Sequence, residues 1–214
     1  MPTLQQWRLL FGGGPITLVR DSFNRPDSAT TLGNADSGQV WTALSGTWGI
    51  SSGQAYVVTT ADGDYQAAVD VGRLNVQYAC DVTLSPTLNR ANPAFLLRGI
   101  DASNYLIASI YKTGTGSADV IQIYKRVSGT YTLLAVLNSA GSVEGTTYHF
   151  VISVVGNTIT VYRNGGVVIS YTLIGSDAVL FGGLTATKVG FRLSLGSLSD
   201  DGRSRWDNLL VKAA

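Results

Sequence analysis

The sequence predicts an all-β domain, built as a two-sheet antiparallel sandwich. Hydrophobic and polar residues alternate with a period of two along much of the chain after Gly53, as they do in half-buried strands. Turn-forming residues separate these segments. The sequence lacks the regular alternation of strands with helices that would indicate an α/β fold. Only 14% of the 214 residues are charged and 25 are glycine, a balance typical of short strands joined by tight turns.

The strand prediction follows the chain in order. Its clearest segment is 76–84, where Val76, Tyr78 and Cys80 share one parity and Gln77 and Ala79 the other, which makes Cys80 a core residue. Because it is the one cysteine of the chain, no disulfide can form within it. The other predicted strands are 95–99, 105–111, 120–127, 131–137, 148–155, 158–163, 167–173, 189–195 and 205–212.

Two turns fix part of the topology. Gly156-Asn157 and Asn164-Gly165 supply residues that accept positive φ at low cost. We therefore expect 148–173 to form a three-stranded antiparallel meander.

The first fourteen residues differ from the rest. Leu4, Trp7 and Phe11 lie at i, i+3 and i+7 with Leu10 beside them, giving a short apolar helical face that ends at three glycines. So short a helix is unstable alone and must dock, either on its own sandwich or on a neighbouring subunit. The flexible glycine run favours the neighbour. The sequence therefore predicts an assembly arm over 1–14, anchored by Trp7, Leu10 and Phe11, and a sandwich domain over 15–214.

Four blocks of sequence carry a resemblance to a known family. They are DSFNRPDSATTLGNADSGQVWTALSGTWGI at 21–50, the segment 99–106, GNTITVYRNG at 156–165 and WDNLLV at 206–211. The chain resembles concanavalin A-like (laminin-G-like) jelly-roll domains, especially those of minor tail and other virion proteins of bacteriophages that infect actinobacteria. The resemblance implies a jelly roll. It leaves function open, because the family includes lectins, glycosidases and structural modules.

The catalytic motif of the family's glycosidases is missing. Those enzymes usually carry the motif E-x-D-x-x-E on one strand, because hydrolysis needs two carboxylates at a set separation. This chain has a single glutamate, Glu144, in a turn-like segment. The pairs Asp62/Asp64 and Asp200/Asp201 lie in glycine-rich segments and are interpreted as solvated turn residues. The sequence therefore favours a protein that is not an enzyme.

A serine–histidine–aspartate triad would require His149, the one histidine of the chain. It alternates with the apolar residues of segment 148–155, and no G-x-S-x-G turn accompanies it. We interpret His149 as a residue on the outside of the sheet.

Asp21 and Asp207 are the candidate metal ligands. Asp207 shares parity with Leu209 and Val211, which predicts an inward side chain at the start of the last strand, while Asp21 opens the first block of the resemblance. Jelly-roll domains of the carbohydrate-binding type, which this chain resembles, often hold a structural calcium between their first and last strands. In the alternative interpretation, Asp207 caps backbone amides and Asp21 pairs with an arginine such as Arg25.

Aromatic residues offer a further kind of site. Trp41 and Trp48 are interpreted as core residues, although either could stack on a sugar. Four tyrosines at strand ends suit glycan contacts and sheet-face packing equally well: Tyr105, Tyr111, Tyr124 and Tyr131.

Charge and hydropathy restrict the partners. With 15 Lys and Arg against 14 Asp and Glu, and no basic run, we expect no nucleic-acid binding. No apolar run reaches the roughly 20 residues of a membrane helix, and no signal peptide is indicated. We therefore expect a virion structural protein, a minor tail or tail-tip component made in the host cytoplasm, that contacts other virion subunits and binds host-surface glycan. The alternatives are a head decoration protein and a free lectin or glycosidase.

Overall fold

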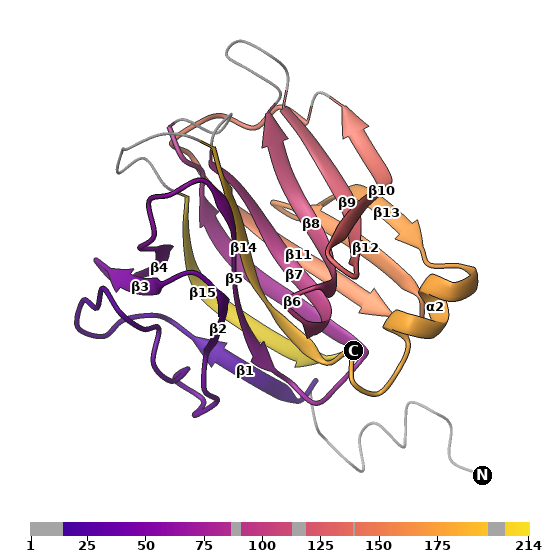
Figure 1. Ribbon diagram of the computed structural model, residues 1–214, viewed down its shortest axis with the longest axis horizontal. Coiled ribbons are helices and arrows are strands. Elements are labelled where there is room, and N and C mark those ends of the chain that lie inside the picture. Colours follow the sequence, from indigo (N-terminus) through magenta and orange to yellow (C-terminus); the bar gives the residue numbers. More distant parts are fainter. Residues whose placement is uncertain (1–14, 87–90, 113–118, 139, 197–203) are drawn as a thin grey trace.

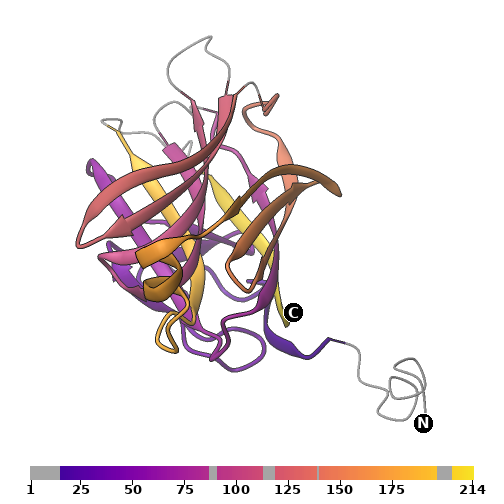
Figure 2. The same cartoon turned by 90° about the vertical axis from the view of Figure 1, so that its right-hand side faces the viewer.

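The computed structural model describes residues 15–86, 91–112, 119–138, 140–196 and 204–214, which form two antiparallel sheets. Figure 1 shows the two layers, and Figure 2 shows them from the side. Sheet I runs in spatial order β13 (Gly166–Thr172), β12 (Thr158–Arg163), β11 (Thr147–Val155), β6 (Val76–Thr83), β15 (Arg205–Ala213), β4 (Gln54–Val57) and β3 (Trp48–Ser51), and β1 (Thr17–Asp21) also pairs with β15.

Sheet II is the second layer. It runs in spatial order β10 (Thr130–Asn138), β9 (Asp119–Val127), β8 (Asn104–Lys112), β7 (Ala91–Asp101), β14 (Lys188–Leu195), β5 (Gly63–Asp70) and β2 (Thr42–Ser45). The predicted all-β sandwich is confirmed. The predicted meander is also confirmed, because β11, β12 and β13 are consecutive antiparallel neighbours in sheet I.

The core lies between the sheets and is rich in aromatic rings. Trp41 stacks on Phe191 with ring centroids 5.0 Å apart, and Trp48 lies 5.4 Å from Trp206. All four side chains are buried, so both tryptophans of the 21–50 block are core residues, as interpreted from the sequence. Cys80 is also fully buried, and burial raises the pKa of its thiol well above the ordinary value. A buried, protonated thiol is a packing residue and not a nucleophile.

The sequence did not predict the short helix α2 (Gly175–Phe181), which carries the chain from β13 in sheet I towards β14 in sheet II. It lies beside one end of the sandwich in both views (Figures 1 and 2). The buried Arg98 guanidinium donates to the carbonyls of Phe181 and Gly156, both at 2.7 Å. These contacts join the end of α2 to the β11–β12 turn. A helix of seven residues with an exposed Val179 has too little periodicity to be recognised from sequence.

The proposed arm at 1–14 lies outside the described residues, and so do its anchors Trp7, Leu10 and Phe11. Among the helices of the described part, none is long and apolar enough to cross a membrane.

Candidate functional site

The outer face of sheet II, which points away from the main core, carries a second apolar cluster. Its buried members come from three strands of the sheet, β5, β7 and β8, and the aromatic rings of β9 and β10 pack against them. These side chains are buried although they lie on an outer face, because neighbouring side chains on the same face cover them. The buried members are Ala68, Ala94, Leu96, Tyr105 and Ile107.

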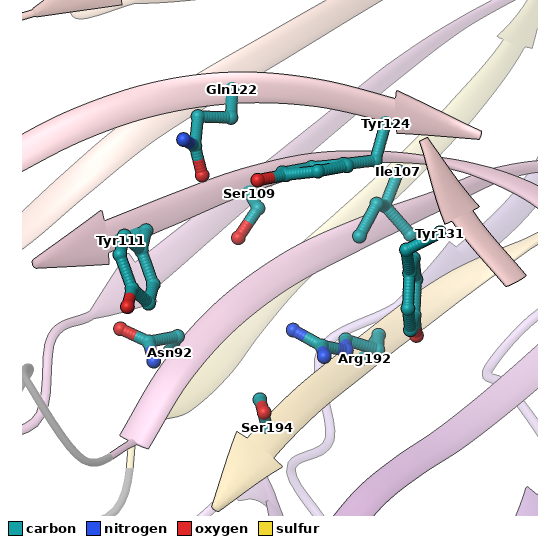
Figure 3. A pocket seen from close by; sticks show the side chains of 9 residues that line it. All are labelled: Asn92, Ile107, Ser109, Tyr111, Gln122, Tyr124, Tyr131, Arg192 and Ser194. Carbon is teal, nitrogen blue, oxygen red and sulfur yellow. The ribbon is translucent and has the colours of Figure 1, made fainter. Parts of the chain in front are cut away.

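A cavity of about 200 Å³ opens on this face. Figure 3 shows its lining side chains converging from β7, β8, β9, β10 and β14. Three are tyrosines, five are neutral polar or aliphatic residues and one is an arginine. We call this the sheet II pocket; it is lined by Asn92, Ile107, Ser109, Tyr111, Gln122, Tyr124, Tyr131, Arg192 and Ser194.

Tyr131 forms one wall of the pocket, between two arginines. The guanidinium carbons of Arg126 and Arg192 lie 5.0 and 5.4 Å from its ring centroid, in the range of cation–π contacts. Its hydroxyl lies 2.6 Å from that of Tyr105, which also accepts a hydrogen bond from Arg126 Nη1 at 3.0 Å. Burial raises the pKa of Tyr131 far above its ordinary value of 10.0, so this hydroxyl keeps its proton at any physiological pH. The wall is therefore held from several sides.

Among the described residues that line the pocket, Arg192 is the only charged one. Its Nη2 donates to the Asp64 carboxylate on the neighbouring strand β5. The interpretation of Asp64 as a turn residue is therefore wrong: it begins a strand and pairs with a buried arginine. The other pair of the sequence, Asp200 and Asp201, lies outside the described residues.

A second hollow lies on the other side of Arg126. It is lined by Leu44, Ser45, Asp64, Gln66, Ala102, Ser103 and Arg126. Gln66 is only 1% exposed, and neither of its amide atoms has a hydrogen-bond partner among the described residues. The buried Nε of Arg192, on the strand beside it, is likewise without a partner. Unpaired buried polar groups are rare and concentrate where a protein meets a ligand or ordered water.

The predicted metal ligand Asp21 faces the core and its carboxylate is fully engaged. Arg25 donates to both of its oxygens at 2.7 and 3.0 Å, Trp41 Nε1 donates at 2.8 Å and the Phe23 amide at 2.9 Å. This is the alternative interpretation made from the sequence, in which Asp21 pairs with Arg25.

Asp207 lies on the opposite face of sheet I, so its predicted inward orientation is wrong. Asn208 has φ of 52°, and the register with β6 shifts there, which marks a β-bulge. The extra residue turns both Trp206 and Leu209 inward and leaves Asp207 outward, opposite Asp81. The first and last strands do pair, but the structure does not bring the two carboxylates together, and calcium binding by Asp21 and Asp207 stays a prediction.

His149 lies on the outer face of sheet I, as expected from its parity. Its Nδ1 is 2.6 Å from Asp81 Oδ1, and Asn208 Nδ2 donates to the other Asp81 oxygen at 2.9 Å. About half of the imidazole side chain is exposed. No serine hydroxyl bonds to this imidazole in the described part of the chain, so these contacts do not form a triad.

The structure shows where the four strand-end tyrosines lie. Tyr111, Tyr124 and Tyr131 line the sheet II pocket, while Tyr105 is buried beneath it. The polar residues of β7 and β14 were not predicted. Nothing in the sequence marks Asn92 and Arg192 as neighbours, because β7 and β14 pair only through the topology of the sheet.

No protein-family model matches this sequence. No curated protein matches it either. Solved structures do. The carbohydrate-binding module CBM66 from Bacillus subtilis superposes with a TM-score of 0.60 at 18% identity, over 81% of this chain and 95% of that one.

Two further structures superpose over most of both chains. The CBM2 module of the evolved Dit of Lactobacillus casei BL23 phage J-1 gives a TM-score of 0.56 at 14% identity, over 92% of this chain and 95% of that one. The β-glucanase of Bacillus licheniformis gives 0.55 at 12% identity, over 94% and 99%. At such identities the likeness establishes the fold alone, the jelly-roll sandwich that these binding modules and hydrolases share.

Proposed function

We propose that this protein is a glycan-binding module without hydrolytic activity, and that the sheet II pocket is its binding site. One observation carries the proposal: three tyrosine rings and several neutral polar groups converge on a preformed cavity, and none of the described residues that line it bears a carboxylate. Sugars present apolar C–H faces, which pack on aromatic rings, and hydroxyls, which pair with amide and hydroxyl groups. Few polar groups placed on a largely apolar wall are typical of a small-ligand site.

The absence of an acid pair from this lining separates binding from hydrolysis. A retaining or inverting glycosidase needs two carboxyl groups across the scissile bond. Asp64, a carboxylate that contacts the pocket lining, is engaged by Arg192. The structural likeness to a β-glucanase and to carbohydrate-binding modules is compatible with both hydrolysis and binding. The proposal of binding without hydrolysis therefore rests on the residues of the pocket.

We further propose that the module belongs to a bacteriophage particle, as a minor tail or tail-tip component. The sequence blocks that resemble actinobacteriophage virion proteins support this, and so does the full-length likeness to a module of a phage Dit protein. Many copies on one particle would make a weak single-site affinity effective. Residues 1–14, with Trp7, Leu10 and Phe11, remain the proposed contact to other virion subunits. A head decoration protein is the second candidate within the particle.

The test of the binding site uses the full chain on a glycan array, followed by calorimetry with the best glycan. Tyr111→Ala should weaken binding about three- to tenfold, because an aromatic contact contributes about 0.5–1.5 kcal/mol. Tyr162→Ala is the matched control, since Tyr162 lies on the outer face of sheet I, far from the pocket in the sheet order. Equal affinities for the two variants would contradict the proposed site.

The particle assignment has its own test. Mass spectrometry of purified virions should find this chain, and immunogold labelling should place it on the tail. Absence from the particle would remove the virion proposal and leave the binding module.

A further inference from the structure

We infer that the sheet II pocket selects an acidic glycan, with Arg192 as the residue that recognises a carboxylate on the sugar; this inference rests on the proposed glycan-binding function. The argument concerns the charge, the placement and the remaining hydrogen-bonding capacity of one side chain.

Arg192 supplies the only formal charge among the lining residues that the structure describes. Eight other described residues line the pocket, and none of these eight is an aspartate, glutamate or lysine. A carboxylate that entered would meet one cation, the hydroxyls of Ser109 and Ser194, and the amides of Asn92 and Gln122, with no lining carboxylate to repel it. This set of donors is complementary to a sugar that bears hydroxyls and one acidic group.

The guanidinium is buried and fixed in place. The Arg192 side chain is only 10% exposed, its Nη2 is held by Asp64, and its plane lies beside the Tyr131 ring. Because an arginine held in this way has already lost much of its freedom, binding a ligand costs less ordering entropy. A neutral sugar hydroxyl would accept one hydrogen bond from this cation, whereas a carboxylate would add the attraction between opposite charges and can accept two.

Part of the guanidinium remains available. An arginine has five N–H donors, and those that the described residues engage are on Nη2. Nε is buried and without a partner. Figure 3 shows the guanidinium end of Arg192 directed towards the middle of the pocket, facing the space between Asn92, Ser109 and Tyr131. The guanidinium end, and not the buried Nε, is therefore the part of Arg192 directed to where a ligand would lie.

The experiment compares each acidic probe with its own neutral counterpart. Oligogalacturonate, alginate oligomers and hyaluronan oligomers are titrated into the full chain at low salt, and so are the same oligomers after chemical reduction of their carboxyl groups to alcohols. We expect at least one acidic probe to bind about tenfold or more tighter than its reduced form, as a hydrogen bond to a charged group predicts. The preference should shrink as salt is added.

Variants assign the preference to a residue. Arg192→Gln should reduce the acid-to-neutral ratio to about twofold or less, and Arg192→Lys should leave an intermediate ratio because it keeps the charge without the planar fork. Lys212→Gln removes one positive charge from β15 in sheet I and should leave the ratio unchanged. The comparison of probes on the unaltered protein holds even if Arg192→Gln does not fold.

Each other outcome is decisive. Acidic and reduced probes that bind equally well would overturn the inference and leave the glycan-binding proposal standing. A preference that survives in a folded Arg192→Gln protein would also overturn it. If the unaltered protein binds neither these probes nor any glycan on the array, the proposed function itself is overturned. If it binds a glycan on the array but none of these acidic or reduced probes, only the inference of an acidic glycan is overturned.

Discussion

Two arginine–aspartate pairs in this protein have the same chemistry and opposite roles. In the Arg25–Asp21 pair every acceptor is used: Asp21 accepts from Arg25, Trp41 and the Phe23 amide, and Arg25 donates further to the Leu32 carbonyl. In the Arg192–Asp64 pair a single arginine nitrogen, Nη2, makes the contact, and the guanidinium end faces a cavity. We expect the first pair, whose acceptors are all used, to stabilise the fold, and we propose that the second pair contacts a ligand.

The largest effect on stability should come from breaking the Arg25–Asp21 pair. Asp21→Asn removes the charge from a fully buried carboxylate and leaves Arg25 with only the more distant Asp36 as a carboxylate partner. We expect the free energy of unfolding to fall by about 3–5 kcal/mol, the usual cost of breaking a buried ion pair. Urea denaturation followed by tryptophan fluorescence measures it.

Asp36→Asn is the control for that change. Asp36 also faces Arg25, but at 3.9 Å, and its side chain is 30% exposed, so its loss should cost about 1 kcal/mol or less. Similar losses for the two variants would show that burial does not distinguish the pairs.

The Arg192–Asp64 pair should contribute less to stability than the Arg25–Asp21 pair. A double-mutant cycle of Arg192→Gln and Asp64→Asn should give a coupling energy of about 1 kcal/mol, because Asp64 is 27% exposed and makes one contact. The corresponding cycle of Arg25→Gln and Asp21→Asn should give at least twice that value. A larger coupling in the Arg192 pair would indicate that this pair, too, is structural.

The smallest effect concerns Asp207, which has no arginine partner among the ion pairs of the described residues. Burial, followed by the charges of Asp81 and Asp21, raises the pKa of this carboxyl above its ordinary value of 3.8. The folded state therefore binds the proton more tightly than the unfolded state, and stability falls as the pH rises from 3.8 through the raised pKa.

Asp207→Asn should abolish this decline and stabilise the protein at neutral pH by less than about 1 kcal/mol, since solvent screens a half-exposed group. Melting temperatures of both proteins between pH 3 and 7 test it. A variant that is less stable at neutral pH would mean that the ionised carboxylate is favourable.

Much of the fold was predictable because strand alternation is a local property. The parity of Val76, Tyr78 and Cys80 correctly indicated an inward face, and Gly156-Asn157 correctly indicated a turn. Parity failed at Asp207, since one residue in a bulge, Asn208, reverses every inward and outward assignment before it. A bulge of this kind carries no reliable signal in a single sequence.

The sequence by itself determined the class of fold, the position of the meander, the burial of Trp41 and Trp48, and the absence of a paired-glutamate motif. These properties follow from residue type and from spacing along the chain. Only the tertiary structure decided that Arg192 on β14, Asn92 on β7 and Tyr111 on β8 share one cavity. The physical reason is that neighbours in a sheet are chosen by the packing of whole strands against a common core, so residues far apart in the sequence become the walls of one site.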